Sequence, residues 1–192
     1  HMGRLILGAC LWFLLPFGVG AQDSLHVGIS TNIRALSIPK ADDWWFGGSK
    51  GWLGHSTDGG KNWVLRQPLG ASVDFRNLHA FNGMEAVAAV AGQPAAIVRT
   101  ADGGQTWQEV FRHPDSLAFL DGFAFWNARE GVIFGDPLAD GRLLLLFTQD
   151  GGRSWQQPAD SMRPLFAPGE AAFAASGTAM QCAGDSTLAL VS

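Results

Sequence analysis

Apolar residues alternate with polar ones in many short segments of this chain, and glycine-rich turns separate these segments. A period of two along the sequence predicts β-strands, and no segment after residue 21 has a helical period. The strands group into three sets of four, so an all-β protein is expected. The predicted strands are 33–38, 44–48, 52–56 and 62–65, then 75–81, 86–91, 96–100 and 106–111, and last 120–126, 131–135, 143–148 and 154–157.

A phrase with the pattern Ser/Thr-x-Asp-Gly-Gly-x-x-Trp follows the third strand of each set. Its aspartates, Asp58, Asp102 and Asp150, are 44 and 48 residues apart, which indicates one supersecondary unit per repeat. The Asp and Ser/Thr oxygens suit a tight turn, the glycines permit positive φ, and the Trp starts the return strand. The residues given this structural role are Ser56, Asp58, Gly59, Gly60, Trp63, Thr100, Asp102, Gly103, Gly104, Trp107, Thr148, Asp150, Gly151, Gly152 and Trp155.

This phrase resembles the Asp box, or BNR repeat, of sialidase-like β-propellers. The resemblance covers nearly all of the chain after residue 30 and implies four-stranded antiparallel blades whose two outer strands are joined by the box. We therefore expect 22–192 to form an incomplete ring of about three and a half blades, part of a complete protein of about six to eight blades. The expected blades are 33–66, 75–111, 120–157 and the start of a fourth at 171–192, with strands at 180–183 and 187–191.

Residues 2–21 have the features of a secretory signal peptide. Arg4 is followed by an apolar stretch, and a small-x-small cleavage site ends at Ala21. The protein is therefore expected to be secreted or periplasmic, with no integral membrane span after cleavage. Apolar residues follow Cys10 in place of the polar ones that a lipoprotein would have, which disfavours lipidation. Cleavage would leave Cys182 as the only cysteine, without an intrachain disulfide.

Composition narrows the possible chemistry. The formal net charge is −4 and no basic run occurs, so nucleic acid is not an expected partner. No metal-ligand spacing and no nucleotide-binding fingerprint is present, and we expect neither a metal nor a cofactor. The chain has no Tyr, the nucleophile of sialidases.

Two arginines and an aspartate align between repeats near the start of each innermost strand: Arg34, Arg76 and Asp121. At the mouth of a central channel, the two guanidiniums would suit a carboxylate or an acidic peptide. Alternatively, they pair with Asp121 and only tie blades together. Trp44 and Trp45 lie outside the boxes and are candidates for a contact surface or for packing between blades.

Three phrases, at 43–51, 134–137 and 169–178, resemble secreted YVTN/BNR-like proteins related to the photosystem II stability/assembly factor. This resemblance implies a non-catalytic module that binds proteins or peptides through an arginine-bearing face, which Arg34 and Arg76 match by strand position. Some Asp-box propellers instead cleave glycans with two carboxylates. A glycoside hydrolase using Asp121 and Asp136 is therefore the alternative, with a glycan as partner. The oxidoreductase label that some relatives carry is a weaker alternative, because no nucleotide fingerprint supports it.

Overall fold

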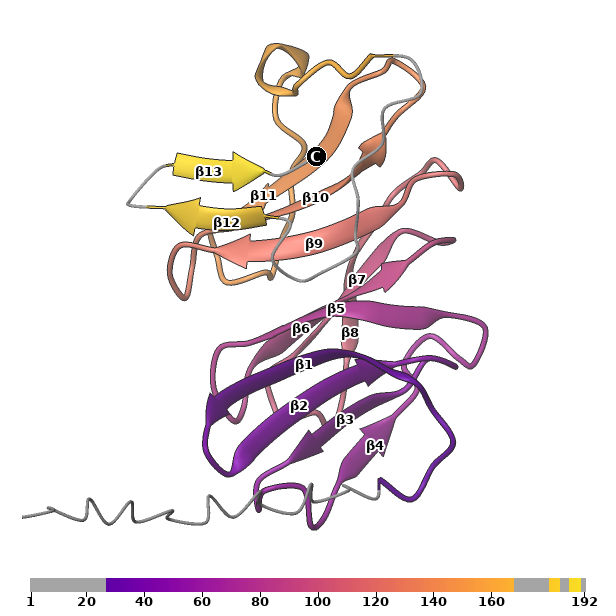
Figure 1. Cartoon of the computed structure of the whole chain (residues 1–192), viewed down its shortest axis with the longest axis vertical. Helices are drawn as coiled ribbons and strands as arrows, with labels where there is room; N and C mark the ends of the chain where they lie inside the picture. Colours follow the sequence, from indigo (N-terminus) through magenta and orange to yellow (C-terminus); the bar gives the residue numbers. More distant parts are fainter. Residues whose placement is uncertain (1–26, 168–179, 184–186, 191–192) are drawn as a thin grey trace, which may run out of the picture.

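The computed structural model describes residues 27–167, 180–183 and 187–190, and in it antiparallel sheets follow one another along the molecule (Figure 1). Blade one has the order β1-β2-β3-β4, blade two β5-β6-β7-β8 and blade three β11-β10-β9. The strands are β1 Ile33–Lys40, β2 Asp43–Gly48, β3 Leu53–Ser56, β4 Val64–Arg66, β5 Asp74–Ala80, β6 Ala86–Ala91, β7 Ala96–Thr100, β8 Gln108–Arg112, β9 Leu120–Phe125, β10 Gly131–Pro137 and β11 Leu143–Thr148. The predicted all-β propeller of four-stranded blades, present as an incomplete ring, is confirmed.

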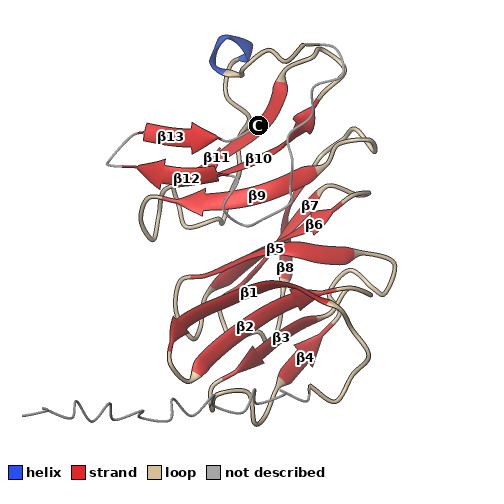
Figure 2. Ribbon diagram, viewed as in Figure 1, coloured by secondary structure: helices blue, strands red, loops and turns tan. Residues whose placement is uncertain are grey.

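The innermost strands of successive blades lie side by side. β1 contacts β5, β5 contacts β9, and β9 contacts β12 (Met180–Ala183), which pairs with β13 (Thr187–Leu190) (Figure 1). Within the described residues the only helical element is a short 3₁₀ helix, η1 (Asp160–Met162), shown in blue in Figure 2. No helix in this part of the chain is long and apolar enough to cross a membrane.

The fourth strand predicted for blade three, at 154–157, is wrong. Only an isolated bridge between Phe147 and Gln156 forms there. Pro158 follows two residues later and has no N–H to continue the ladder. The other end of β11 is covered by a later segment, in which Leu165 bridges Arg142 and the carbonyl oxygen of Pro164 accepts from the Leu143 N–H. The outer edge of blade three is therefore shared between two separate segments.

The three Asp boxes adopt one hydrogen-bonded geometry. In the first, the Ser56 hydroxyl donates to Asp58 Oδ1 at 2.8 Å and accepts from the Gly60 N–H at 2.8 Å. Thr100 with Asp102, and Thr148 with Asp150, repeat these bonds. The paired glycines of all three boxes have φ between 70° and 85°, the region that favours glycine. The predicted turn chemistry is confirmed.

The core lies between the blades. Leu53 of blade one packs with Phe75 and Val98 of blade two, and Ile97 of blade two packs with Leu146 of blade three, all almost completely buried. Burying each such side chain contributes about 1.5–3 kcal/mol. Each blade therefore depends on its neighbour for much of its stability.

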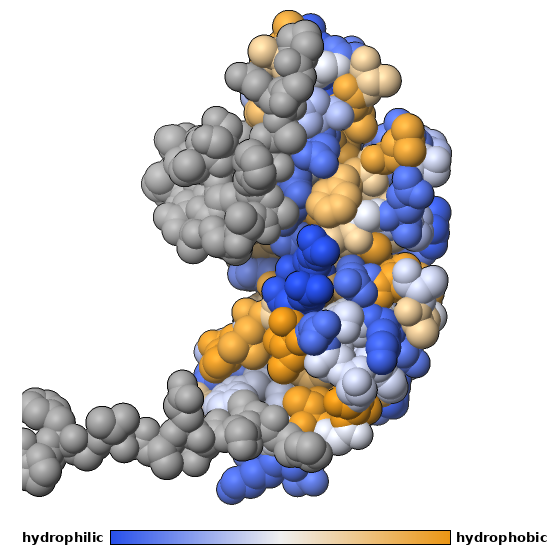
Figure 3. Space-filling model, turned by 45° about the vertical axis from the view of Figure 1, so that its right-hand side comes forward, coloured by the Kyte–Doolittle hydropathy of each residue, from blue (hydrophilic) through white to orange (hydrophobic). Residues whose placement is uncertain are grey.

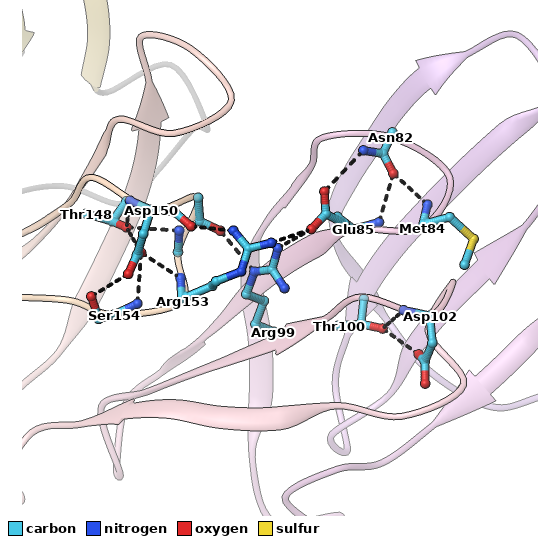
Figure 4. Close-up of polar contacts among 12 residues, drawn as sticks. Asn82, Met84, Glu85, Arg99, Thr100, Asp102, Thr148, Asp150, Arg153 and Ser154 are labelled. Atoms are coloured by element: carbon cyan, nitrogen blue, oxygen red, sulfur yellow. Dashed lines mark hydrogen bonds and ion pairs between the residues drawn. The ribbon is translucent and has the colours of Figure 1, made fainter.

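A polar side chain from the third strand of each of the first two blades also reaches the next Asp box. His55 Nδ1 lies 2.9 Å from the Gly103 carbonyl oxygen, and Arg99 Nε donates to the Gly151 carbonyl oxygen at 3.0 Å. Figure 4 shows the second of these junctions, in which Glu85 joins Arg99 and Arg153. The boxes thus serve as docking points between blades as well as turns within them.

Candidate functional site

All three residues aligned from the sequence occupy β-bulges on innermost strands. In β1, Ile33 pairs with Gly48 and Ala35 with Gly47, so that Arg34 has no partner across the ladder. The same register shift isolates Arg76 in β5 and Asp121 in β9. A bulge bends its strand and re-aims the extra side chain. Since the blades repeat one topology, the three bulges fall at the same end of the innermost strands.

The two arginines of this set are exposed, whereas the aspartate is buried. Neither the Arg34 nor the Arg76 guanidinium forms an ion pair within the part of the chain that the structure describes. An exposed guanidinium that forms no internal ion pair can accept an external anion in bidentate geometry. This end of the innermost strands therefore offers two cationic groups to a ligand.

Asp121 is 6% exposed, and its Oδ2 is enclosed without a hydrogen-bond partner among the described atoms. The pKa of Asp121 is raised to about 7, first by burial and then by the negative charge of Asp136 on β10, while the positive charge of Arg76 opposes the rise. A carboxyl near its titration midpoint at neutral pH, beside a second carboxylate and a cation, is a common feature of functional sites. The structure thus brings three predicted residues together: Arg76, Asp121 and Asp136.

The two tryptophans proposed as contact residues differ in position. Trp44 is half-buried, and its Nε1–H donates to the Ala41 carbonyl oxygen at 2.7 Å. Trp45 has no exposed surface and stacks on His55 with ring centroids 3.6 Å apart. The suggestion that Trp45 forms a contact surface is therefore wrong, because its ring fills the space between blades one and two.

An apolar stripe beside Arg34 was missed by the sequence reasoning. Ile33, Leu36 and Ile38 of β1 are 49%, 57% and 48% exposed. Figure 3 shows hydrophobic side chains gathered on the surface of the lower part of the molecule, next to strongly hydrophilic ones. The alternation of apolar residues in this segment could have revealed the stripe. The stripe places an aliphatic surface next to the guanidinium of Arg34.

Within the residues that the structure describes, no group of three or more His, Cys, Asp or Glu side chains could hold a metal ion. The candidate site consists of Arg34, Arg76, Asp121, Asp136 and the apolar stripe.

A family model described as "Photosynthesis system II assembly factor YCF48" matches residues 20–118 of the chain. The chain belongs to this family. The match covers blades one and two, with Arg34 and Arg76. No curated protein matches the chain.

Solved structures agree with the YCF48-type fold. The structure "YCF48 bound to D1 peptide" is 21% identical with a TM-score of 0.52, covering 68% of this chain and 40% of that one. "YCF48 from Cyanidioschyzon merolae" is 19% identical with a TM-score of 0.52, covering 69% and 41%. An ancestral GH74 enzyme is 18% identical with a TM-score of 0.51, covering 66% and 18%. At these identities the likeness is one of fold. The chain spans about two fifths of the length of the YCF48 structures that it matches.

Proposed function

We propose that this chain is a non-catalytic β-propeller module that binds an anionic segment of a protein or peptide at the Arg34–Arg76 end of its innermost strands. The observation that carries the proposal is the repeated bulge, which presents an exposed guanidinium at the same position in blades one and two. Membership of the YCF48 family supports it, as does the similarity of the fold to a YCF48 structure with a bound D1 peptide.

The chemistry of the surface fits such a ligand. Each guanidinium has a planar fork of donors that matches a carboxylate, and hydrogen bonds to charged groups contribute about 1.5–3 kcal/mol. The apolar stripe of Ile33, Leu36 and Ile38 lies on the same strand as Arg34 and offers surface to aliphatic side chains of the ligand. A peptide that carries both acidic and aliphatic residues is therefore the expected ligand class.

The test is a binding titration with D1 peptide and with hexaglutamate, both labelled with fluorescein. The double variant Arg34→Gln/Arg76→Gln should weaken binding of both peptides at least tenfold, since two charge-assisted contacts are lost. Arg112→Gln is the matched control, because Arg112 is exposed on the outermost strand β8 and pairs with Glu109. Equal affinities for the wild type and the double variant would refute the proposal.

We further propose that the protein is exported, with the signal peptide at 2–21 removed. Expression of the chain in a Gram-negative bacterium should yield a periplasmic product whose mass corresponds to a chain starting at Gln22. A cytoplasmic product that retains Arg4 would contradict export.

A glycoside hydrolase remains the second candidate, on the basis of one observation. Asp121 has a pKa of about 7 and lies close enough to Asp136 to feel its charge, and an acid with a raised pKa beside a carboxylate is the pair that such hydrolases use. Screening the chain against β-glucans, with Asp121→Asn and Asp136→Asn as controls, tests this. We expect no hydrolysis above the level of the variants.

A further inference from the structure

Asp121 differs from the other two bulge residues in a way that peptide binding alone does not explain. It occupies the same backbone position as Arg34 and Arg76, but it is an acid, and its side chain is buried. A carboxylate in such a place lacks solvent, and Oδ2 has no hydrogen-bond partner among the described atoms to replace it. Leaving a buried acceptor unpaired costs about 1–3 kcal/mol, and more when the group is charged.

Among the described residues, the strands that contact β9 contain few charged groups. On β5 they are Arg76, which attracts its charge, and Asp74, which accepts from the Lys50 N–H. The third titratable group of β5, His79, stacks on Phe125 and has its pKa lowered to about 4 by burial, so it is neutral near pH 7. β6 and β12 contact β9 and contain no ionisable acid or base other than Cys182.

On β10 the acidic neighbour is Asp136. An anionic ligand on Arg76 would therefore bring a further negative charge close to Asp121, in addition to that of Asp136. Carboxylates that share a site do not all ionise, because like charges at short range raise the pKa of one member.

We propose that capture of an anionic peptide at Arg76 is coupled to proton uptake by Asp121, whose carboxylate repels the ligand when it is ionised and no longer does so when it is neutral. This inference rests on the proposed function. No bond other than the O–H of the Asp121 carboxyl forms or breaks, and the proton comes from solvent.

The titration behaviour of Asp121 supports this coupling. With a pKa raised to about 7, the carboxyl in the free protein is mostly neutral at pH 6 and mostly ionised at pH 8. If only the neutral form binds, the apparent Kd rises in proportion as that form becomes depleted. Binding should therefore weaken about tenfold between pH 6 and pH 8, because the neutral fraction falls about tenfold over this range.

The experiment is isothermal titration calorimetry of the whole chain with hexaglutamate at pH 6, 7 and 8, each in two buffers of different ionisation enthalpy. The glutamates stay ionised over this range. The wild type should take up close to one proton per ligand at pH 8 and far less at pH 6. Asp121→Asn is neutral at every pH, and should bind with a constant Kd and no proton uptake. Asp136→Asn removes the repulsion and should move the midpoint of the wild-type profile to lower pH.

The outcomes separate the two proposals. Binding that depends on Arg34 and Arg76 but has the same pH profile in the wild type and Asp121→Asn would overturn the proton coupling and leave the peptide-binding function intact. Binding that is indifferent to both arginines would overturn the function itself. Circular dichroism of each variant checks that it is folded. If Asp121→Asn does not fold, the shift in midpoint of Asp136→Asn decides, and an unmoved midpoint counts against the coupling.

Discussion

Two junctions hold neighbouring blades together, one between blades one and two and the other between blades two and three. Both use the same type of contact, but with different side chains. In both, a residue just before the box Ser/Thr reaches the carbonyl oxygen of the first glycine of the next box: His55 to Gly103, and Arg99 to Gly151. An acid supports each of these residues. His55 Nε2 lies 2.8 Å from Asp43 Oδ1, and Arg99 pairs with Glu85. The constant feature is therefore the carbonyl acceptor, and its partner can vary.

The side chain that packs against each polar residue is large where the polar residue is short and small where it is long. The short imidazole of His55 is covered by Trp45, whereas the longer Arg99 is accompanied by Val87 at the equivalent position of β6. Each second-strand residue presses on the next box. A Cβ added to Gly104 would lie 3.2 Å from the Trp45 ring, and one added to Gly152 would lie 2.6 Å from Val87 Cγ1. Small box glycines therefore permit close docking at both junctions.

The burial of the ionic pairs also differs. The side chains of His55 and Asp43 are 4% and 8% exposed, whereas the Glu85 side chain is 32% exposed and is shared with Arg153 on the surface. At the first junction both ring nitrogens of His55 face oxygen atoms and solvent is excluded. The comparison shows that the first junction relies on a closed aromatic cluster and the second on a partly solvated charge network (Figure 4).

The largest expected effect on stability comes from replacing the second-strand residue of the first junction, Trp45, by valine, the residue type found in the second junction. Trp45→Val removes most of a fully buried ring and should lower the free energy of unfolding by about 3–4 kcal/mol, mainly through the cavity that it leaves. Adding His55→Arg should recover part of this loss, since the longer side chain re-enters the space. Urea unfolding of the single and double variants measures the coupling. Additive losses in the double variant would show that the two positions do not compensate for each other.

A smaller effect is expected from removing the acids. Asp43→Ala leaves the buried Nε2 of His55 without its partner and should lower the free energy of unfolding by about 3 kcal/mol. Glu85→Ala should cost about 1 kcal/mol, because water can reach the site and Arg99 keeps the Gly151 carbonyl oxygen as acceptor. Urea unfolding at pH 7 compares the two variants. Equal losses would show that burial does not distinguish the junctions.

The features that could be predicted from the sequence are those encoded within a single repeat. Three copies of one phrase were enough to identify the boxes, the strands around them and the shared position of Arg34, Arg76 and Asp121. Each of these features depends on residues close together in the chain, where periodicity and turn chemistry act directly.

Features that depend on pairing between segments could not be read from the sequence. The bulges at Arg34, Arg76 and Asp121 arise from the register against a second strand. The split edge of blade three depends on a later segment that is held by the buried Arg163, which donates to the Leu143 carbonyl oxygen and pairs with Asp140 and Asp160.

The polar junctions were hidden for a different reason. His55 and Arg99 occupy equivalent positions in their blades but are different residue types. An alignment of the repeats therefore does not show that both contact the next box. The burial of Asp121 was hidden as well, because its neighbours in sequence do not determine how closely β5 and β10 enclose it.

The smallest effect concerns the boxes, which stay constant where the junctions vary. The pKa of Asp58 is lowered to about 2, first by the backbone N–H of Asn62 and then by the Asn62 side chain and the Ser56 hydroxyl. Asn62→Ala keeps the backbone bond and removes the Nδ2–H donor that lies 2.7 Å from Oδ2, so the pKa should rise part of the way toward 3.8, its ordinary value.

Carboxyl NMR titration of the wild type and Asn62→Ala measures that change at Asp58, with Asp102 as the internal control. Because the folded pKa of Asp58 is depressed, its contribution to stability is present above the ordinary value and is lost as pH falls toward about 2. The variant should lose this contribution at a higher pH. An unchanged Asp58 midpoint would mean that the backbone donors and the Ser56 hydroxyl hold the carboxylate without help from the Asn62 side chain. The Asp box would then tolerate different residue types at its seventh position. In the same way, the junctions tolerate different residue types at the position that reaches the glycine carbonyl oxygen.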